Sequence, residues 1–267
     1  MTSHSIGRWI FAATAVLLIS MSSGMWAAEP VRLRVLSYNI HHAEGADGKL
    51  DLKRIAGVIK SVEPDLVALQ EVDWKTTRVK GIDEPVELAL LTGMTAVFGK
   101  NIDLQGGEYG NAVLSRFPIH SKRNHLLPRL DDSEQRGVLE LEIALPGDAG
   151  SVKLFATHLD YRRDDQERLA SAKAINALVA ESDQPAILAG DLNATPDSAV
   201  LKLFLSTWTN TSKEPQPTIP VGKPERQIDF VLTRPASRWK TIETKVLDEA
   251  VASDHRAILA VLELKTP

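Results

Sequence analysis

From residue 31 onward, alternating and continuous apolar runs divide the chain into short segments typical of an α/β protein. Clear alternation over 137–145 predicts a strand with one buried face, and 31–40 begins with the same pattern. The runs at 66–69 and 186–189 are continuous, which is typical of strands covered on both faces. Further apolar runs predict strands at 111–114, 152–159, 228–232 and 257–264.

Helical spacing of apolar residues predicts three helices between these strands. Asp51 is placed to cap a helix that extends to about residue 62. The longest helical pattern covers 164–180, and a short one covers 199–205. The segment 212–226 contains four prolines and is expected to be a surface loop. Because no linker or repeat interrupts the pattern, we expect a single α/β domain over residues 29–267.

The first 28 residues have a different pattern. Arg8 is their only formal charge, and a short apolar run at 9–19 precedes Ser-, Gly- and Ala-rich sequence. A basic start, a short apolar core and a small-residue exit predict a signal peptide over residues 1–28. The mature protein is then secreted or periplasmic. The alternative is a membrane anchor formed by an uncleaved N-terminal segment, although the apolar run is short for a bilayer.

Composition narrows the chemistry that the domain can perform. The chain has no cysteine, which excludes disulfides, Cys-ligated zinc, iron–sulfur clusters and thiol nucleophiles. Its formal net charge is −4. Without Arg8 the balance is 30 basic against 35 acidic residues, or −5. A general attraction to polyanions is therefore not expected.

Polar side chains gather where the predicted strands begin or end. A single Asp at such a place is usually a turn or cap residue. Six such clusters in one domain instead favour a functional site, because rigid strands deliver such residues to the loops where α/β proteins bind ligands. The clusters contain Asn39; Glu71; His158 with Asp160; Asp191 with Asn193; Asp229; and Asp254 with His255.

These residue types suit hydrolysis of a phosphoester. Carboxylate and amide oxygens are the ligands that Mg²⁺ or Mn²⁺ prefers, and histidines can donate protons to phosphate oxygens. No Ser, Thr or Cys is clearly presented as a nucleophile. The expected reaction is direct attack of water on phosphorus, with a metal stabilising the charge.

Seven segments resemble, in order, the endonuclease/exonuclease/phosphatase superfamily with the DNase I-like fold. The resemblance implies an α/β four-layer sandwich, with two packed mixed β-sheets flanked by helices. It also implies divalent-metal-dependent cleavage of a phosphoester. The segments are SYNIHH (37–42), PDLVALQEVD (64–73), YGNAVLSRFPI (109–119), THLDYR (157–162), GDLNATPDS (190–198), QIDFVL (227–232) and SDHRAILAVLEL (253–264).

The resemblance also implies roles for the polar residues. Asn39 and Glu71 match the amide and carboxylate of the metal site, and Asp254 matches a further metal or water contact. The remaining matches are catalytic. Asp191 corresponds to the residue that activates water, Asn193 to a phosphate contact, His255 with Asp229 to a phosphate-contacting pair, and His158 to a second catalytic histidine.

Neighbouring residues are weaker candidates. Arg78 and Arg136 are expected to bind a substrate phosphate, with a solvated or salt-bridged surface arginine as the alternative for each. Glu108 is a candidate partner of His158. His41 and His42 follow the metal strand, but a loop histidine is more often incidental.

The leading hypothesis is a secreted metal-dependent phosphoesterase acting on a phosphodiester or phosphomonoester. The substrate is a small molecule, a lipid headgroup or a nucleic acid. The acidic balance favours a general phosphodiesterase or phosphatase, and a secreted nuclease acting on DNA or RNA is the first alternative. A non-catalytic binding protein of the same fold is the second, although the acid, base and metal residues are all present. We expect a monomer without an obligate protein partner.

Overall fold

The computed structural model describes residues 1–2, 4, 30–147 and 149–265. The expected signal peptide over residues 1–28 lies almost wholly outside the described residues. Within the described part of the chain, no helix has the length and apolar character needed to cross a membrane.

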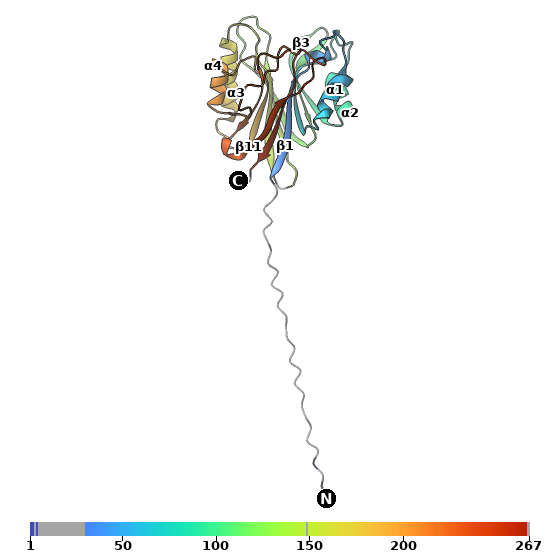
Figure 1. Ribbon diagram of the computed structural model, residues 1–267, viewed down its shortest axis with the longest axis vertical. Coiled ribbons are helices and arrows are strands. Elements are labelled where there is room, and N and C mark those ends of the chain that lie inside the picture. The colour runs from blue at the N-terminus through green and yellow to red at the C-terminus, as the bar shows by residue number, and fades with distance from the viewer. Residues whose placement is uncertain (3, 5–29, 148, 266–267) are drawn as a thin grey trace.

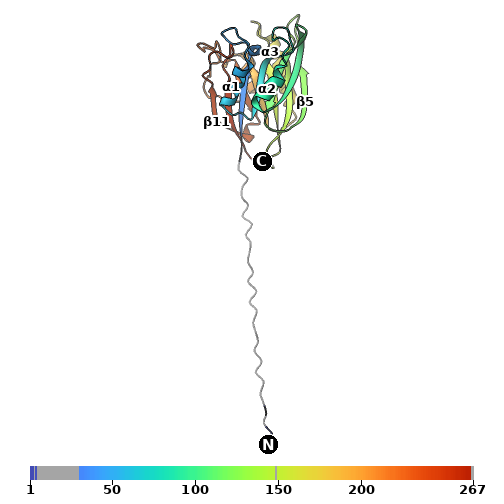
Figure 2. The ribbon, with the colours of Figure 1, turned by 90° about the vertical axis from the view of Figure 1, so that its right-hand side faces the viewer.

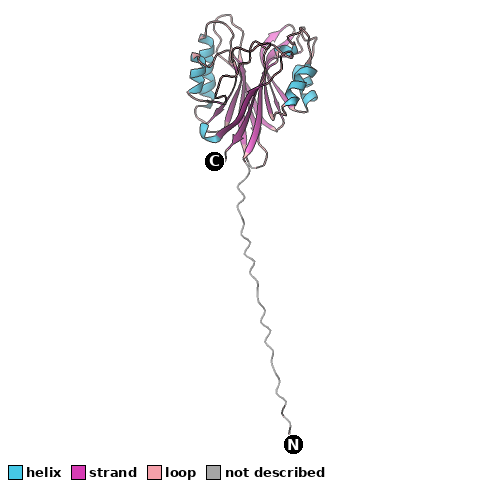
Figure 3. Ribbon diagram, viewed as in Figure 1, coloured by secondary structure: helices cyan, strands magenta, loops and turns pink. Residues whose placement is uncertain are grey.

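Two six-stranded sheets form the centre of the molecule (Figure 3). The first sheet has the order β11 (Trp239–Val246), β12 (Ile258–Leu264), β1 (Val31–Asn39), β2 (Leu66–Trp74), β4 (Gly107–Ser115) and β3 (Thr95–Leu104). The second has the order β5 (Ile119–Leu126), β6 (Gly137–Ala144), β7 (Ser151–His158), β8 (Ala186–Asp191), β10 (Asp229–Arg234) and β9 (Thr209–Asn210). Both sheets are mixed, because β1 with β2 and β7 with β8 are parallel while the other described pairs are antiparallel.

Helices flank the two sheets on their outer faces (Figure 1). The helices α1 (Leu52–Ser61) and α2 (Glu84–Thr92) lie on the first sheet, and Figure 2 views the molecule from their side. The helices α3 (Gln166–Val179) and α4 (Ala199–Leu205) lie on the second. Short 3₁₀ turns occur at His41–Ala43 and Ala236–Arg238.

The predicted cap of α1 is present, since the Asp51 carboxylate accepts the Arg54 N–H at 2.9 Å. The long helix is two residues shorter at its start than the apolar pattern predicts. Asp164 and Asp165 precede α3 and do not belong to it. One of them still supports the helix start, because the Asp164 carboxylate accepts the Gln166 N–H at 2.9 Å.

Three apolar layers hold the sheets and helices together. The central layer lies between the sheets and contains fully buried side chains such as Leu66 and Leu154. A second layer joins the first sheet to α1, as at Ile55, and a third joins the second sheet to α3, as at Ile175. Full burial of each such side chain contributes about 1.5–3 kcal/mol. The four-layer α/β sandwich predicted from the resemblance is confirmed.

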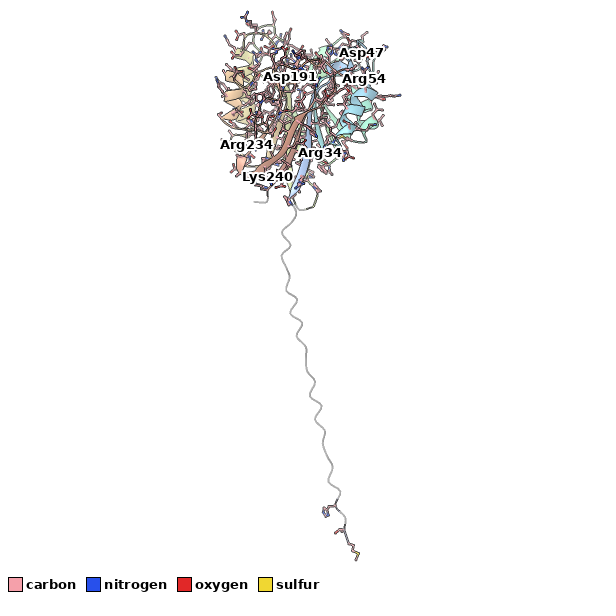
Figure 4. All side chains as sticks on the ribbon, in the orientation of Figure 1. Arg34, Asp47, Arg54, Asp191, Arg234 and Lys240 are labelled. Carbon is pink, nitrogen blue, oxygen red and sulfur yellow. The ribbon has the colours of Figure 1, made fainter. Side chains whose placement is uncertain are left out.

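The topology brings the ends of distant strands to one edge of the sandwich. The parallel pairs β1–β2 and β7–β8 run toward this edge, and the antiparallel strands β10 and β12 start from it. Asp229, at the start of β10, therefore lies opposite Asp191, at the end of β8. In Figure 4 Asp191 lies toward one end of the molecule, away from Arg34 and Lys240.

Candidate active site

A cavity of about 610 Å³ opens at the edge where these strands meet. Its lining includes Glu71, His158, Asp191, Asn193 and His255, which come from both sheets. This volume is in the range that binds small molecules. The structure thus gathers into one cavity side chains that are up to 184 positions apart in the sequence, from Glu71 to His255.

An irregularity in β2 presents Glu71 to the cavity. The pairing of β2 with β4 shifts register between Leu69 and Val72, and Glu71 has a left-handed backbone with φ of 57°. A bulge of this kind redirects a side chain out of the regular alternation. The Nδ2 of Asn39 donates to Glu71 Oε1 at 2.9 Å and lies 3.3 Å from Asp191 Oδ2. Asn39 therefore links the two carboxylates.

The donor set at Asn39 and Glu71 fits a divalent cation. Glu71 lines this polar cavity and forms no ion pair with another described residue. Asp191 is fully buried beside it, and Asn39 donates to both carboxylates, so two acidic side chains and one amide converge on the same place. Carboxylate and amide oxygens of this kind are the hard ligands that Mg²⁺ or Mn²⁺ prefers.

His255 and Asp229 form a buried ion pair. The His255 Nδ1 donates to Asp229 Oδ2 at 2.9 Å, and the Thr218 hydroxyl donates to the same oxygen at 2.5 Å. Burial opposes protonation of His255, but the carboxylates of Asp229 and Asp191 outweigh it and raise the pKa of His255 to about 10. At neutral pH His255 is therefore an imidazolium whose Nε2–H is free to face an anion.

His158 is held in the opposite protonation state. Burial, followed by the nearby Arg136 guanidinium, lowers the pKa of His158 well below its usual value. Arg136 Nη1 donates to His158 Nδ1 at 3.1 Å. The other ring nitrogen, Nε2, lies 3.1 Å from the side-chain Nδ2 of Asn193. That nitrogen lies 3.5 Å from Asp191 Oδ2.

Asp191 lies between the two histidines. Its Oδ2 is 3.5 Å from His158 Nε2 and 3.8 Å from His255 Nε2, while its Oδ1 accepts the Asn193 N–H at 2.8 Å. Burial and the neighbouring Asp229 carboxylate raise the pKa of Asp191 to about 7. A carboxylate with a pKa near neutrality is suited to accept a proton from water.

The two predicted phosphate-binding arginines line the cavity but are held by protein groups. The Arg78 guanidinium makes two 2.7 Å hydrogen bonds to the buried carboxylate of Asp73. Arg136 contacts His158 and also Glu134, at 3.0 Å. Each of these arginines thus has a positioning partner within the protein, in addition to its exposure to the cavity.

The structure corrects one expectation, since Glu108 does not contact His158 and instead pairs with Lys100 at 3.2 Å. Asp254 is not among the residues that line the cavity, but its Oδ1 lies 3.3 Å from Ser253 Oγ, which in turn lies 2.7 Å from the Asn39 main-chain oxygen. Its role as a metal or water contact stays a prediction.

His41 and His42 lie closer to the site than their sequence position indicated. His41, His42 and Glu71 each have one potential ligand atom, and these three atoms lie within 4.8 Å of one another. Their chain turns back directly after β1 because residues 41–43 all have positive φ. Neither the spacing of apolar residues nor a motif predicts this turn, because it depends on three non-glycine residues in left-handed conformations.

The residues that support the catalytic groups were hard to find from the sequence. Glu134 and Thr218 lie in loops and contact Arg136 and Asp229, respectively. Arg163 and Arg226 also line the cavity. A run of basic residues after a catalytic strand is a signal for Arg163, but nothing in the Pro-rich loop points to Arg226.

The fold and the site define a phosphoester hydrolase of the DNase I-like type. The profile of the Endonuclease/Exonuclease/phosphatase family matches residues 36–255, and the chain belongs to this family. Its members are hydrolases of phosphoric esters and generally depend on divalent metals. The protein is therefore a hydrolase of this class.

Known proteins resemble the chain over most of its length. It is 27% identical to the protein YbhP of Escherichia coli K12 over 246 residues, covering 86% of this chain and 96% of YbhP. A solved endonuclease/exonuclease/phosphatase from Beutenbergia cavernae has a TM-score of 0.74 and 28% identity, covering 87% of this chain and 72% of that one. A mannosyl-6-phosphatase from Bacteroides thetaiotaomicron shares the fold at a TM-score of 0.68 and 20% identity, covering 86% and 99%.

Proposed function

We propose that the protein is an exported phosphoesterase that requires Mg²⁺ or Mn²⁺ and hydrolyses a phosphodiester or phosphomonoester by direct attack of water. The observation that carries this proposal is the position of Asp191 between two histidines of opposite protonation state. Asn39 joins Asp191 to Glu71, so base and metal ligand share one hydrogen-bonded group.

Each side chain has a distinct task in this reaction. Asp191 accepts a proton from the attacking water, and Asn193 fixes its orientation through the 2.8 Å main-chain hydrogen bond. The charged Nε2–H of His255 donates to a phosphoryl oxygen, where negative charge develops. The neutral imidazole of His158 lies beside Asp191 and Asn193, next to the same phosphoryl group. Asp229 keeps His255 charged and oriented through the 2.9 Å bond to Nδ1.

A divalent ion would be held by Glu71 and the Asn39 oxygen, with Asp191 adjacent. When bound, such an ion supplies positive charge that stabilises the pentacoordinate phosphorus transition state. Mg²⁺ and Mn²⁺ both accept this set of oxygen donors.

A nuclease acting on DNA or RNA is the second candidate. The arginines that line the cavity are the observation in its favour, because they favour anionic ligands in general. The net charge of −4 argues for a smaller substrate, since polynucleotide binding relies on neutralising several phosphates at once.

A substrate panel tests the proposal and separates the two candidates. Purified protein would be incubated with bis-p-nitrophenyl phosphate, a sugar phosphate, plasmid DNA and RNA, each with Mg²⁺ or Mn²⁺. We expect turnover of a small phosphoester to exceed nucleic-acid cleavage. Faster cleavage of DNA or RNA would favour the nuclease, and no turnover of any phosphoester would overturn the proposed function.

The pattern of residues 1–28 supports export, so the protein is proposed to be secreted or periplasmic. We also propose that the mature chain is a monomer without an obligate protein partner. Mass spectrometry of the protein purified from the expressing cells would show a mature start between residues 24 and 29. An intact Met1 in the membrane fraction would instead support an uncleaved anchor.

A further inference from the structure

The catalytic cavity carries more positive charge than its catalytic residues require. Its described lining contains six arginines and no lysine, against the three carboxylates of Glu71, Glu134 and Asp191. This excess of positive charge occurs in a chain whose net charge is −4. The arginines are Arg78, Arg136, Arg162, Arg163, Arg168 and Arg226.

Four of these arginines are already bound to groups of the protein. Their guanidinium groups therefore contribute to the structure of the cavity wall. The contacts join Arg78 to Asp73 at 2.7 Å, Arg136 to Glu134 at 3.0 Å, Arg162 to Glu167 at 2.7 Å and Arg168 to the Asp160 carbonyl at 2.8 Å.

Arg163 and Arg226 differ from these four. Both are exposed, and neither guanidinium makes an ion pair or a side-chain hydrogen bond within the described part of the chain. Arg163 lies on the loop that follows β7. Arg226 lies just before β10, where its main-chain N–H donates to Ile219 O at 3.0 Å and fixes the backbone. The two free guanidinium groups thus come from separate segments and border the same cavity.

We propose that Arg163 and Arg226 form an anion subsite beside the catalytic residues, which binds a second phosphate or carboxylate group of a small phosphoester substrate. This inference rests on the proposed function and defines its substrate class. A guanidinium presents paired donors that match the oxygens of both anions. A phosphate held by His158 and His255 would leave these two arginines available for another anionic group on the same molecule.

The size of the cavity favours a small polyanion over a polynucleotide. A volume of about 610 Å³ holds a metabolite-sized ligand and encloses both the catalytic residues and the two arginines. A polynucleotide needs positive charge that continues along the backbone beyond the cavity. Six of the 31 Lys and Arg residues of the chain line this one cavity.

Calorimetric binding measurements test the subsite. The Asp191→Asn variant is used so that bound substrate is not hydrolysed. Its affinities for fructose 1,6-bisphosphate and for fructose 6-phosphate are measured in the presence of Mg²⁺. We expect the bisphosphate to bind about 10-fold or more tightly than the monophosphate, as one additional charge-assisted contact would produce. When Arg163→Gln and Arg226→Gln are added to this variant, the ratio of the two dissociation constants should come close to one.

A matched control uses Arg123, an exposed arginine on β5 that does not line the cavity. Arg123→Gln in the same background should preserve the ratio. The subsite is wrong if mono- and bisphosphate bind equally, or if the double variant retains the preference. Tighter binding of a single-stranded hexanucleotide through the same two arginines would overturn the small-substrate class. A wrong proposed function would give a different result from a wrong subsite, because the wild-type protein would then hydrolyse no phosphoester at all.

Discussion

Asp191 shows how burial prepares one side chain for chemistry. Burial and the Asp229 carboxylate raise its pKa to about 7, whereas Asp229 and the other acidic neighbours raise the pKa of His255 to about 10. The same cluster therefore produces a base that can accept a proton near neutrality and a cation that keeps its proton. Such divergence between neighbouring groups is characteristic of active sites.

Asp191→Asn should remove activity without removing stability. The amide can still accept the Asn193 N–H, but it cannot accept a proton from water. We expect kcat to fall by about 10²–10⁴-fold. Because ionised Asp191 is disfavoured by burial, the midpoint of thermal unfolding should stay equal or rise. Retained turnover, or a large fall in this midpoint, would make Asp191 a structural residue.

Arg136→Met tests whether Arg136 controls the protonation of His158. Removing the guanidinium removes one of the causes that lower the pKa of His158, so this pKa should rise. The imidazole resonance of His158, assigned with a His158→Ala variant, would be titrated by NMR in chelator-treated protein. We expect the transition to occur at a higher pH in Arg136→Met than in the wild type. An unchanged titration would mean that burial and the nearby His255 set the pKa of His158 without Arg136.

At the residue scale, the sequence identified the groups that bear chemistry better than the groups that support them. Asn39, Glu71 and Asp191 could be selected because they follow apolar strands and match ordered segments of a known family. The contact of Arg136 with His158 could not, because it joins a loop residue to a strand end across 22 positions. Asp254 directly precedes His255 in the chain but does not line the cavity with it, so its role as a metal or water contact stays a prediction.

At the scale of the elements, two β–α–β units position the site. In each unit a parallel strand pair, β1–β2 or β7–β8, ends at the edge that bears the cavity. Strands β2 and β8 were predictable because both of their faces are buried and their apolar runs are continuous, and β1 was predictable from its alternating start. The strands β3, β5 and β11 were not predicted. β5 is largely exposed and polar, and β3 and β11 lie at sheet edges, so the burial pattern that marks a strand is weak in all three.

The helix α2 provides a prediction about pH and stability. Glu84 in its first turn is buried and accepts the Asp73 N–H at 2.7 Å. Burial raises the pKa of Glu84 to about 8 in the folded protein, above its usual 4.5. Between these values the unfolded chain releases a proton that the native protein retains, so stability falls as pH rises.

Glu84→Gln should remove this dependence while keeping an acceptor for Asp73 N–H. We expect the variant to be more stable than the wild type by about 1–3 kcal/mol near pH 7, with a smaller difference near pH 4.5. Urea unfolding at several pH values measures the effect. If both proteins lose stability in parallel across this range, Glu84 is not the group responsible.

At the scale of the whole molecule, charge is distributed unevenly. The chain is acidic overall, yet six arginines surround the cavity where the catalytic carboxylates lie. Composition therefore predicted weak attraction to long polyanions but could not show that six arginines line one cavity. Only the three-dimensional arrangement of loops from both sheets brings these arginines together, and we propose that it binds small anionic substrates.

The central claim is that this edge of the sandwich hydrolyses phosphoesters with a metal held by Glu71 and Asn39. The most direct test is the metal dependence of bis-p-nitrophenyl phosphate turnover by the wild type and by Glu71→Gln. We expect chelator to abolish wild-type turnover, Mg²⁺ or Mn²⁺ to restore it, and Glu71→Gln to need a much higher metal concentration. Turnover that persists in chelator, or an unchanged metal requirement in Glu71→Gln, would contradict this account.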